Sequence, residues 1–341
     1  MSNKPPIGVP QGAIRLNTDS QRLEFFAQDR WYEFATDSPT LDGGARGFFM
    51  GGGDPAETDR IDFVTIPTQG NATDFGNLTK ARMEAAALSN STRALAAGDS
   101  VPGSDDTIDV FTMSSTGNAS DFGNLLSATN NMQGNGALAN ETRGIFGGGY
   151  QQGSGQVNIL QFVTINSNGN AVDFGDLIGN SGQFSGVVGG SSPTRGLWYG
   201  GGPSGSANTA ITFVTIASTG NSSDFGEKID TKSHGTAAGN SIRNLLYAGQ
   251  SMTNQIEFVT IATTGNSIDF GDMTITTRYS ATAASSPTRG VVGGGGYPNR
   301  TNVIDYNQIM TQGNSIDFGD LVDDRFLMVK GCVSTGHGGL G

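Results

Sequence analysis

The sequence repeats itself six times, and this repetition constrains the fold more than any other feature. The tripeptide Asp-Phe-Gly recurs at intervals of 45 to 52 residues, each time after a Gly-Asn pair and a segment such as IDFVTI. The six tripeptides begin at Asp74, Asp121, Asp173, Asp224, Asp269 and Asp317. Each unit also contains an earlier segment, such as RGFFMGGG, that begins with an arginine. These arginines are Arg46, Arg93, Arg143, Arg195, Arg243 and Arg289.

Each unit has the pattern of four short strands. The first is small and apolar, as in AAALSN from Ala85, and the second is the arginine segment. The third, IDFVTI in the first unit, is rich in β-branched and aromatic residues. The fourth contains Asp-Phe-Gly and follows a Gly-Asn turn. Helical periodicity is absent, and four antiparallel strands in about 45–50 residues are typical of a propeller blade. We therefore predict an all-β chain with a six-bladed, kelch-like β-propeller over residues 44–341.

The order of the strands predicts how the ring closes. No small apolar strand precedes Arg46, whereas a sixth one follows the last Asp-Phe-Gly within RFLMVKGCVSTG, which begins at Arg325. We expect Leu327–Ser334 to return as the innermost strand of the first blade, so that the ring has no open ends.

Residues 1–43 lie outside the repeats. Within them, 13–34 alternates around two polar turns and predicts a small β-meander of two or three strands, followed by a linker. An isolated hairpin is marginally stable in water, so we expect this N-terminal arm to fold against a partner or a second copy of the chain.

Charge and composition exclude several classes of function. The chain has 31 acidic and 19 basic residues and a net charge of −12, which disfavours nucleic-acid binding and polybasic membrane anchoring. No apolar run approaches the ~18–20 residues of a membrane span, so membrane insertion is not expected. The glycine triplets lack the Lys-Ser/Thr of a phosphate-binding loop, and His234 and His337 lack partners at metal spacing. We predict no cofactor and no metal, and leave open a Ca²⁺ site in the loop Ser104–Asp109.

The Asp-Phe-Gly tripeptide and the repeat arginines are expected to be structural. Protein kinases use Asp-Phe-Gly to hold Mg²⁺, but this chain has six copies and no HRD motif. We expect the Phe to pack between blades, the Gly to permit a bend, and the Asp to cap a turn or meet a base. The strand order places the six arginines and the six aspartates at the same face of the ring, so we predict Arg–Asp pairing across blades.

The loops expected at the opposite face differ most between repeats. Loops on a rigid scaffold are where binding usually resides, and Tyr and Arg are favoured in binding patches. We therefore predict Tyr150, Tyr297 and Arg300 as partner-contacting residues.

The strings RGxFGGG, IDFVTI, TGNAxDFGDL and SSPTRG resemble the kelch-like repeats in virion structural proteins of marine tailed phages, cyanophages especially. The segment IGVPQGAIRLNTDSQRLEFFAQDRWYEF is similar to a short module in the fibres and other appendages of such viruses. Cellular kelch repeats carry a Trp where Asp-Phe-Gly has its Phe, so the resemblance to them is looser and a cellular adaptor role is disfavoured.

The resemblance implies a non-enzymatic virion protein that is made in the host bacterial cytoplasm. It implies a tail fibre or appendage component that displays the propeller for attachment to a host-surface glycan or protein. Residues 1–43 would then dock onto other virion proteins. Two alternatives remain: a capsid-associated decoration or head-fibre protein, and, in another class, a glycan-cleaving propeller enzyme. Whether copies form a homo-oligomer in the particle is left open.

Overall fold

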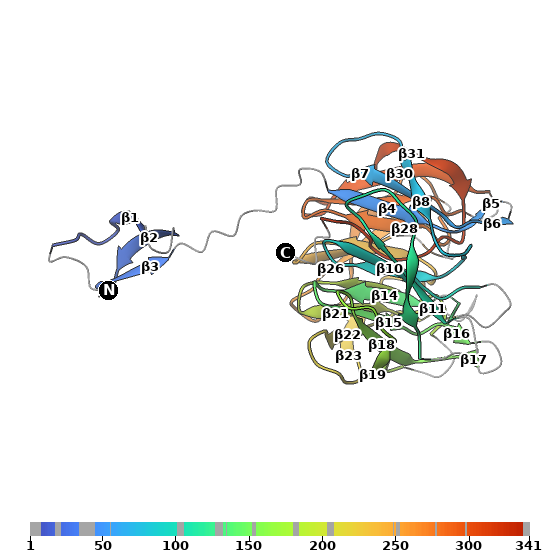
Figure 1. Ribbon diagram of the computed structural model, residues 1–341, viewed down its shortest axis with the longest axis horizontal. Helices are drawn as coiled ribbons and strands as arrows, with labels where there is room; N and C mark the ends of the chain where they lie inside the picture. Colours follow the sequence, from blue (N-terminus) through green and yellow to red (C-terminus); the bar gives the residue numbers. More distant parts are fainter. Residues whose placement is uncertain are drawn as a thin grey trace. The chain divides into compact units, whose positions relative to one another are not determined.

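The chain divides into two compact units, Met1–Leu41 and Asp42–Gly341 (Figure 1). The computed structural model describes residues 8–17, 22–33, 45–54, 56–100, 106–126, 132–133, 135–151, 155–179, 184–202, 208–247, 249, 253–276, 278–296 and 299–336. These residues form antiparallel strands in small sheets and contain no helix, so the chain is all-β as predicted. Accordingly, no helix in these ranges has the length and apolar character needed to cross a bilayer.

The N-terminal unit is a three-stranded antiparallel meander. Its strands are β1 (Ile14–Asn17), β2 (Arg22–Ala27) and β3 (Arg30–Glu33), paired in the order β1-β2-β3. Arg15 bridges two parts of this sheet: its Nη2 lies 2.7 Å from Glu24 Oε2, and its guanidinium carbon lies 4.2 Å from the centre of the Trp31 ring. These contacts hold together a sheet that has little apolar core.

The larger unit contains the repeats, each built from strands of four kinds. The inner strands are β9 (Ala86–Ser89), β14 (Gly136–Ala139), β20 (Val188–Ser191), β24 (Thr236–Gly239) and β28 (Thr282–Ser285). The second strands are β4 (Arg46–Met50), β10 (Arg93–Ala97), β15 (Arg143–Gly147), β21 (Arg195–Tyr199), β25 (Arg243–Tyr247) and β29 (Arg289–Gly293). The third strands are β7 (Arg60–Thr65), β11 (Thr107–Thr112), β18 (Ile159–Thr164), β22 (Ala210–Thr215), β26 (Gln255–Thr260) and β30 (Thr301–Gln308). The outer strands are β8 (Thr73–Asn77), β12 (Ser120–Asn124), β19 (Val172–Asp176), β23 (Ser223–Glu227), β27 (Ile268–Asp272) and β31 (Ile316–Arg325).

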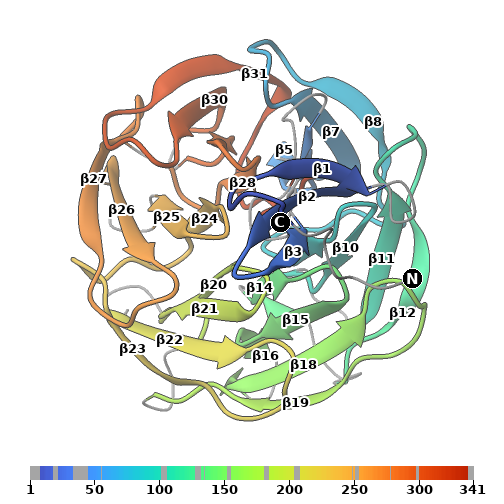
Figure 2. The ribbon, with the colours of Figure 1, turned by 90° about the vertical axis from the view of Figure 1, so that its left-hand side faces the viewer.

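Within a repeat, neighbouring strands pair antiparallel in the order inner, second, third, outer. Figure 2 shows these sheets arranged around a common centre, with the inner strands near it and the outer strands at the periphery. The inner strands are made of small residues because several of them crowd together there. Leu88 and Ala137, from inner strands of consecutive repeats, share one buried cluster.

The apolar core lies between neighbouring sheets. One buried cluster contains Leu95 and Phe122 of the second repeat together with Phe146 and Val163 of the third. The same arrangement recurs around the unit, and the Phe of every Asp-Phe-Gly is buried within it. Fully burying one such side chain contributes about 1.5–3 kcal/mol, so the contact between sheets is the main stabilising element of the unit.

The first repeat has no inner strand before Arg46, and the C-terminal segment pairs with it instead. Phe48 N donates to Val333 O (3.0 Å), and Val329 N donates to Met50 O (3.2 Å). The same segment forms parallel bridges to the inner strands on either side, Ala86 to Lys330 and Ala283 to Cys332. Residues 329–335 therefore lie beside β4, between β9 and β28.

Several short strands occur in loops where no strand was predicted. They are β5 (Gly53–Asp54), β6 (Ala56–Glu57), β13 (Met132–Gln133), β16 (Tyr150–Gln151) and β17 (Gly155–Gln156). They form small local sheets, β5-β6 and β13-β16-β17, at the ends of the repeats.

Candidate functional site

At one end of the larger unit, the repeat arginines bind the next repeat. Arg143 Nη1 donates to Ile216 O (2.8 Å), and its guanidinium carbon lies 4.3 Å from the centre of the Phe162 ring, a cation–π distance. Each of the six arginines donates in this way to the backbone carbonyl of a residue just after a third strand of the next repeat. The acceptor residues, in order, are Met113, Ile165, Ile216, Ile261, Ile309 and Ile66. The last of these bonds joins the sixth repeat to the first.

The predicted Arg–Asp pairing is therefore wrong. Among the residues that the structure describes, no ion pair joins a repeat arginine to an Asp-Phe-Gly aspartate. The arginines leave the second strands, whereas the aspartates lie exposed on the outer strands at the periphery. Each guanidinium instead donates to a backbone carbonyl oxygen just after a third strand.

The Asp-Phe-Gly tripeptide packs against the Gly-Asn turn of the following repeat. In the third repeat, Phe174 is buried and its carbonyl accepts a bond from Gly220 N (2.7 Å). A Cβ on Gly175 would lie 2.5 Å from Gly220 O, so only glycine allows this approach. Asp176 N donates to Asn221 Oδ1 (3.0 Å). The turn thus covers the edge of the preceding outer strand, which would otherwise expose unpaired backbone groups.

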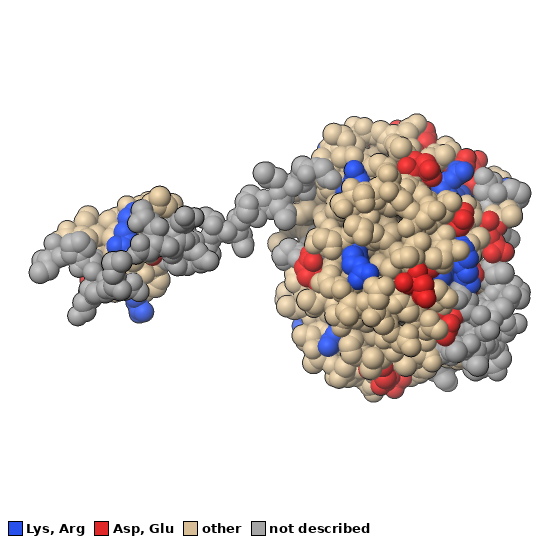
Figure 3. All heavy atoms as spheres, viewed as in Figure 1, with Lys and Arg blue, Asp and Glu red and all other residues tan. Residues whose placement is uncertain are grey.

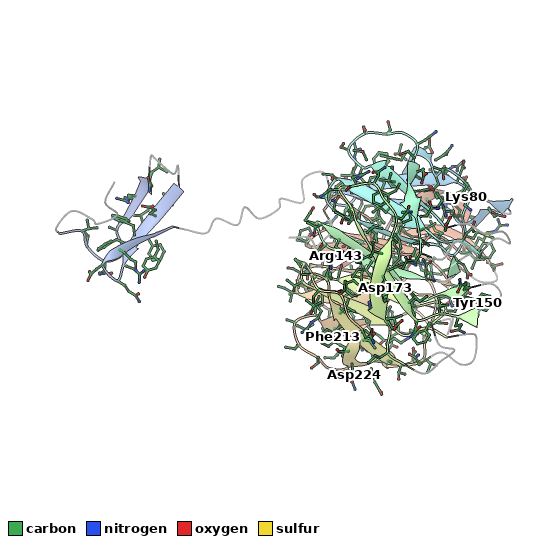
Figure 4. All side chains as sticks on the ribbon, turned by 60° about the horizontal axis from the view of Figure 1, so that its bottom comes forward. Lys80, Arg143, Tyr150, Asp173, Phe213 and Asp224 are labelled. Carbon is green, nitrogen blue, oxygen red and sulfur yellow. The ribbon has the colours of Figure 1, made fainter. Side chains whose placement is uncertain are left out.

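At the opposite end, the loops do not repeat. Figure 4 shows Tyr150 and Lys80 at this end, whereas Arg143 and Phe213 lie at the other. Tyr150 lies in β16 and is 41% exposed, and Arg300 directly precedes β30. These two predicted contact residues belong to the third and sixth repeats, and the described residues give no contact between them. The third, Tyr297, lies outside the described residues.

A ring of strained turns surrounds the centre at this second end. The residue two positions before several inner strands has a positive φ: Glu84 (50°), His234 (56°) and Ser280 (49°), with Gly186 (70°) in the fourth repeat. Leu327 (53°) takes this position in the C-terminal segment. Residues other than glycine rarely adopt this backbone conformation, and the residues that do are often found at functional sites.

Hydrogen bonds link these turns to one another. His234 N donates to Gly186 O (2.9 Å), Ser280 N to His234 O (3.0 Å), and Glu84 N to Leu327 O (2.8 Å). We refer to these five residues as the axial collar. Because each turn is bonded to a neighbouring one, the collar fixes the directions of the side chains it carries.

Buried polar groups cluster at the axial collar. Tyr279 Oη donates to Glu84 Oε1 (3.2 Å), His234 Nε2 lies 3.8 Å from the same oxygen, and the His234 and Tyr279 rings stack with centres 5.0 Å apart. Burial, and secondarily the charge of Lys330, lowers the pKa of His234 to about 3. Burial also lowers the pKa of Lys330 to about 8, although Glu84 opposes this shift. The histidine is therefore neutral at pH 7.

No motif in the sequence points to this cluster. His234 has no partner at metal spacing in the sequence, and no pattern there marks Glu84, Tyr279 or Lys330 as site residues. Aligning the repeats by their inner strands gives a signal for this cluster. In that alignment Glu84, His234 and Ser280 all stand two residues before an inner strand.

A second group of buried charges lies in the third strands. Asp62, Asp109, Glu257 and Asp305 occupy equivalent positions, and each pairs with a base that precedes the inner strand of the same repeat, which for Asp62 is the C-terminal segment. The pairs are Asp62–Arg325, Asp109–Arg82, Glu257–Lys232 and Asp305–Arg278. All eight side chains are buried. The third and fourth repeats have the neutral residues Gln161 and Thr212 at this position, so the charge is not required for the fold of a repeat.

Surface charge and comparisons with other proteins add no further site. On the face seen in Figure 3, basic side chains are separate and interspersed with acidic ones. Within the described ranges, no group of three or more His, Cys, Asp or Glu side chains is placed to hold a metal ion. A comparison with models of protein families finds no match, and a comparison with curated proteins finds no similar sequence.

Proposed function

We propose that residues 44–341 form a six-bladed, kelch-like β-propeller that the C-terminal segment closes. The bonds between repeats support this proposal, because the same set that joins each repeat to the next also joins the sixth to the first. Arg289 Nη1 donates to Ile66 O (3.1 Å), Gly70 N to Phe318 O (3.0 Å), and Asp320 N to Asn71 Oδ1 (3.1 Å).

We further propose that the protein is a non-enzymatic structural protein of a tailed-phage virion, with the propeller displayed for attachment to a host surface. The observation that carries this proposal is the difference between the two ends of the larger unit. At one end the repeat arginines make the same bond in every repeat, whereas the other end presents loops that differ from repeat to repeat on a rigid scaffold, as binding proteins do. Residues 1–43, as a separate unit, would dock this scaffold onto other virion proteins.

Phage particles that carry variants of the loop end test the attachment role. Replacing Tyr150 and Tyr297 with Ala is expected to slow adsorption to host cells and to leave particle assembly intact. Ile242→Ala serves as a matched control, because Ile242 is 52% exposed beside Arg243 at the opposite end. Unchanged adsorption of the double tyrosine variant would contradict attachment through these loops and favour a decoration role.

Two further measurements separate the alternatives. Immunogold labelling of intact particles is expected to mark the tail; labelling of the head would instead support the decoration protein. Incubation of purified protein with host envelope polysaccharide is expected to release no sugar. Release of sugar would contradict the non-enzymatic role and support the glycan-cleaving enzyme.

A further inference from the structure

The second repeat has a pocket at the end of the larger unit where the repeat arginines lie. Its volume is about 270 Å³, close to the lower limit of about 300 Å³ for small-molecule sites, so it admits a single small ring. Its lining contains a guanidinium, a side-chain amide and four hydroxyls, and it contains no carboxylate. These polar groups belong to Arg93, Asn118, Thr112, Ser115, Thr116 and Ser120.

The pocket is large because the second repeat lacks an aromatic ring at this point. Val110 lines it, at a position where the other five repeats have an aromatic residue: Phe63, Phe162, Phe213, Phe258 and Tyr306. In those repeats the ring centre lies 4.3–4.9 Å from the guanidinium carbon of the repeat arginine. The equivalent pocket of the fifth repeat, which Phe258 lines, has a volume of only about 130 Å³, and Arg243 is not part of its lining. The valine therefore enlarges the pocket and opens it to the guanidinium.

Arg93 brings to this pocket a positive charge that no carboxylate balances. Its guanidinium donates to Ile165 O (2.7 Å) and to Asn168 Oδ1, and both acceptors are neutral. A guanidinium has five donor hydrogens, so these two bonds leave donors for a ligand. Within the described part of the chain, no ion pair involves Arg93. A carboxylate is the group that a guanidinium binds most specifically, through two parallel hydrogen bonds.

The turn that carries the other polar groups is fixed by the first repeat. Gly117 N donates to Phe75 O (3.0 Å). Asn118 Oδ1 accepts from Asn77 N (3.1 Å), so the NH₂ group of this amide points to a different partner. The four hydroxyl residues are exposed, and each hydroxyl both donates and accepts. A ligand meets these groups on a turn that is already ordered, which lowers the entropic cost of binding.

We propose that this pocket binds a sugar that carries a carboxylate. The Arg93 guanidinium binds the carboxylate, and the hydroxyl and amide side chains exchange hydrogen bonds with the hydroxyls of the sugar ring. A free sugar acid and a unit of an acidic polysaccharide present the same groups. The pocket lies at the end opposite the non-repeating loops, so the inference goes beyond the proposed attachment role and does not depend on it.

Saturation-transfer NMR of the full-length protein with sodium galacturonate and sodium glucuronate tests the site. We expect saturable binding of at least one of these sugar acids. Galactose, which has the ring without the carboxylate, and sodium acetate, which has the carboxylate without the ring, are both expected to bind several-fold more weakly. Tighter binding of trigalacturonate than of galacturonate identifies a polysaccharide as the source, and the reverse identifies a free sugar.

Variants of the lining locate the binding. Val110→Phe introduces the ring that four other repeats carry, so it is expected to abolish binding while the unfolding temperature does not fall. Ser115→Ala is expected to weaken binding several-fold, whereas Thr263→Ala, at the equivalent position of the fifth repeat, is expected to leave it unchanged. Arg93→Gln is expected to remove the preference for galacturonate over galactose.

Four results would overturn the inference. The first is the absence of saturable binding of both sugar acids by the wild type, and the second is equal binding by Val110→Phe. The third is galactose binding as tightly as the sugar acids, which would contradict the role of Arg93. The fourth is an equal loss of affinity in Ser115→Ala and Thr263→Ala, which would show that the second repeat has no special site.

Discussion

The ion pair between Arg82 and Asp109 allows a quantitative test of the buried charges. Both side chains are 0% exposed, and Arg82 Nη2 lies 3.3 Å from Asp109 Oδ1. Asp109 Oδ2 also accepts from Thr79 N (3.2 Å), and Arg82 donates to Gly98 O (3.0 Å) and Thr107 O (3.1 Å). Arg82→Met removes the cation and leaves the carboxylate buried without a counter-charge.

Breaking a buried pair by removing one partner costs about 3–5 kcal/mol, a large part of a total stability of about 5–15 kcal/mol. We therefore expect the unfolding temperature of Arg82→Met to fall by about 5–8 °C. The double variant Arg82→Met/Asp109→Asn is expected to recover most of this loss. The third repeat carries the neutral version of the site, where Gln161 Oε1 accepts from Leu126 N (2.6 Å).

Denaturant unfolding of the wild type, both single variants and the double variant gives the full double-mutant cycle. The smaller loss is expected for Asp109→Asn, because Arg82 keeps its two carbonyl acceptors. The reasoning is refuted if Arg82→Met loses less than about 1 kcal/mol, or if the double variant is less stable than Arg82→Met.

Three further outcomes are expected. Gly175→Ala should lower the unfolding temperature, because its Cβ would meet Gly220 O, whereas Gly169→Ala should be tolerated, since nothing lies within 4 Å of that Cβ; equal effects would contradict the contact. A chain ending at Leu321 lacks the segment beside β4 and should aggregate or melt far below the full chain; an unchanged melting temperature would refute ring closure. Because the pKa of His234 is about 3 when folded and 6.5 when unfolded, its stabilising contribution is complete above pH 6.5 and falls, by up to about 5 kcal/mol, as the pH drops toward 3. Asn tolerates a positive φ, so His234→Asn should reduce the pH dependence of the unfolding free energy between pH 6.5 and 3. An unchanged pH dependence would show that protonation of His234 does not cause it.

The sequence by itself determined the all-β class, the six repeated units and the strands within each. Local patterns encode these features: alternating β-branched and aromatic residues form strands such as β7, and Gly-Asn turns end them. The small residues of the inner strands also predicted their place near the centre, because large side chains do not fit where several strands converge. Counting the repeated segments shows that no inner strand precedes Arg46 and that a sixth one follows the last Asp-Phe-Gly. This count predicted the pairing of the C-terminal segment with β4.

Only the tertiary structure decided which side chains meet across repeats. The repeat arginines and the aspartates occur at constant spacing, but the sequence does not show that a carbonyl such as Ile216 O lies closer to Arg143 than any carboxylate. The axial collar brings together Glu84, His234 and Lys330, which are about 96 to 246 residues apart in the chain. Their burial and the lowered pKa values of His234 and Lys330 depend on that convergence, and so no local pattern marks them.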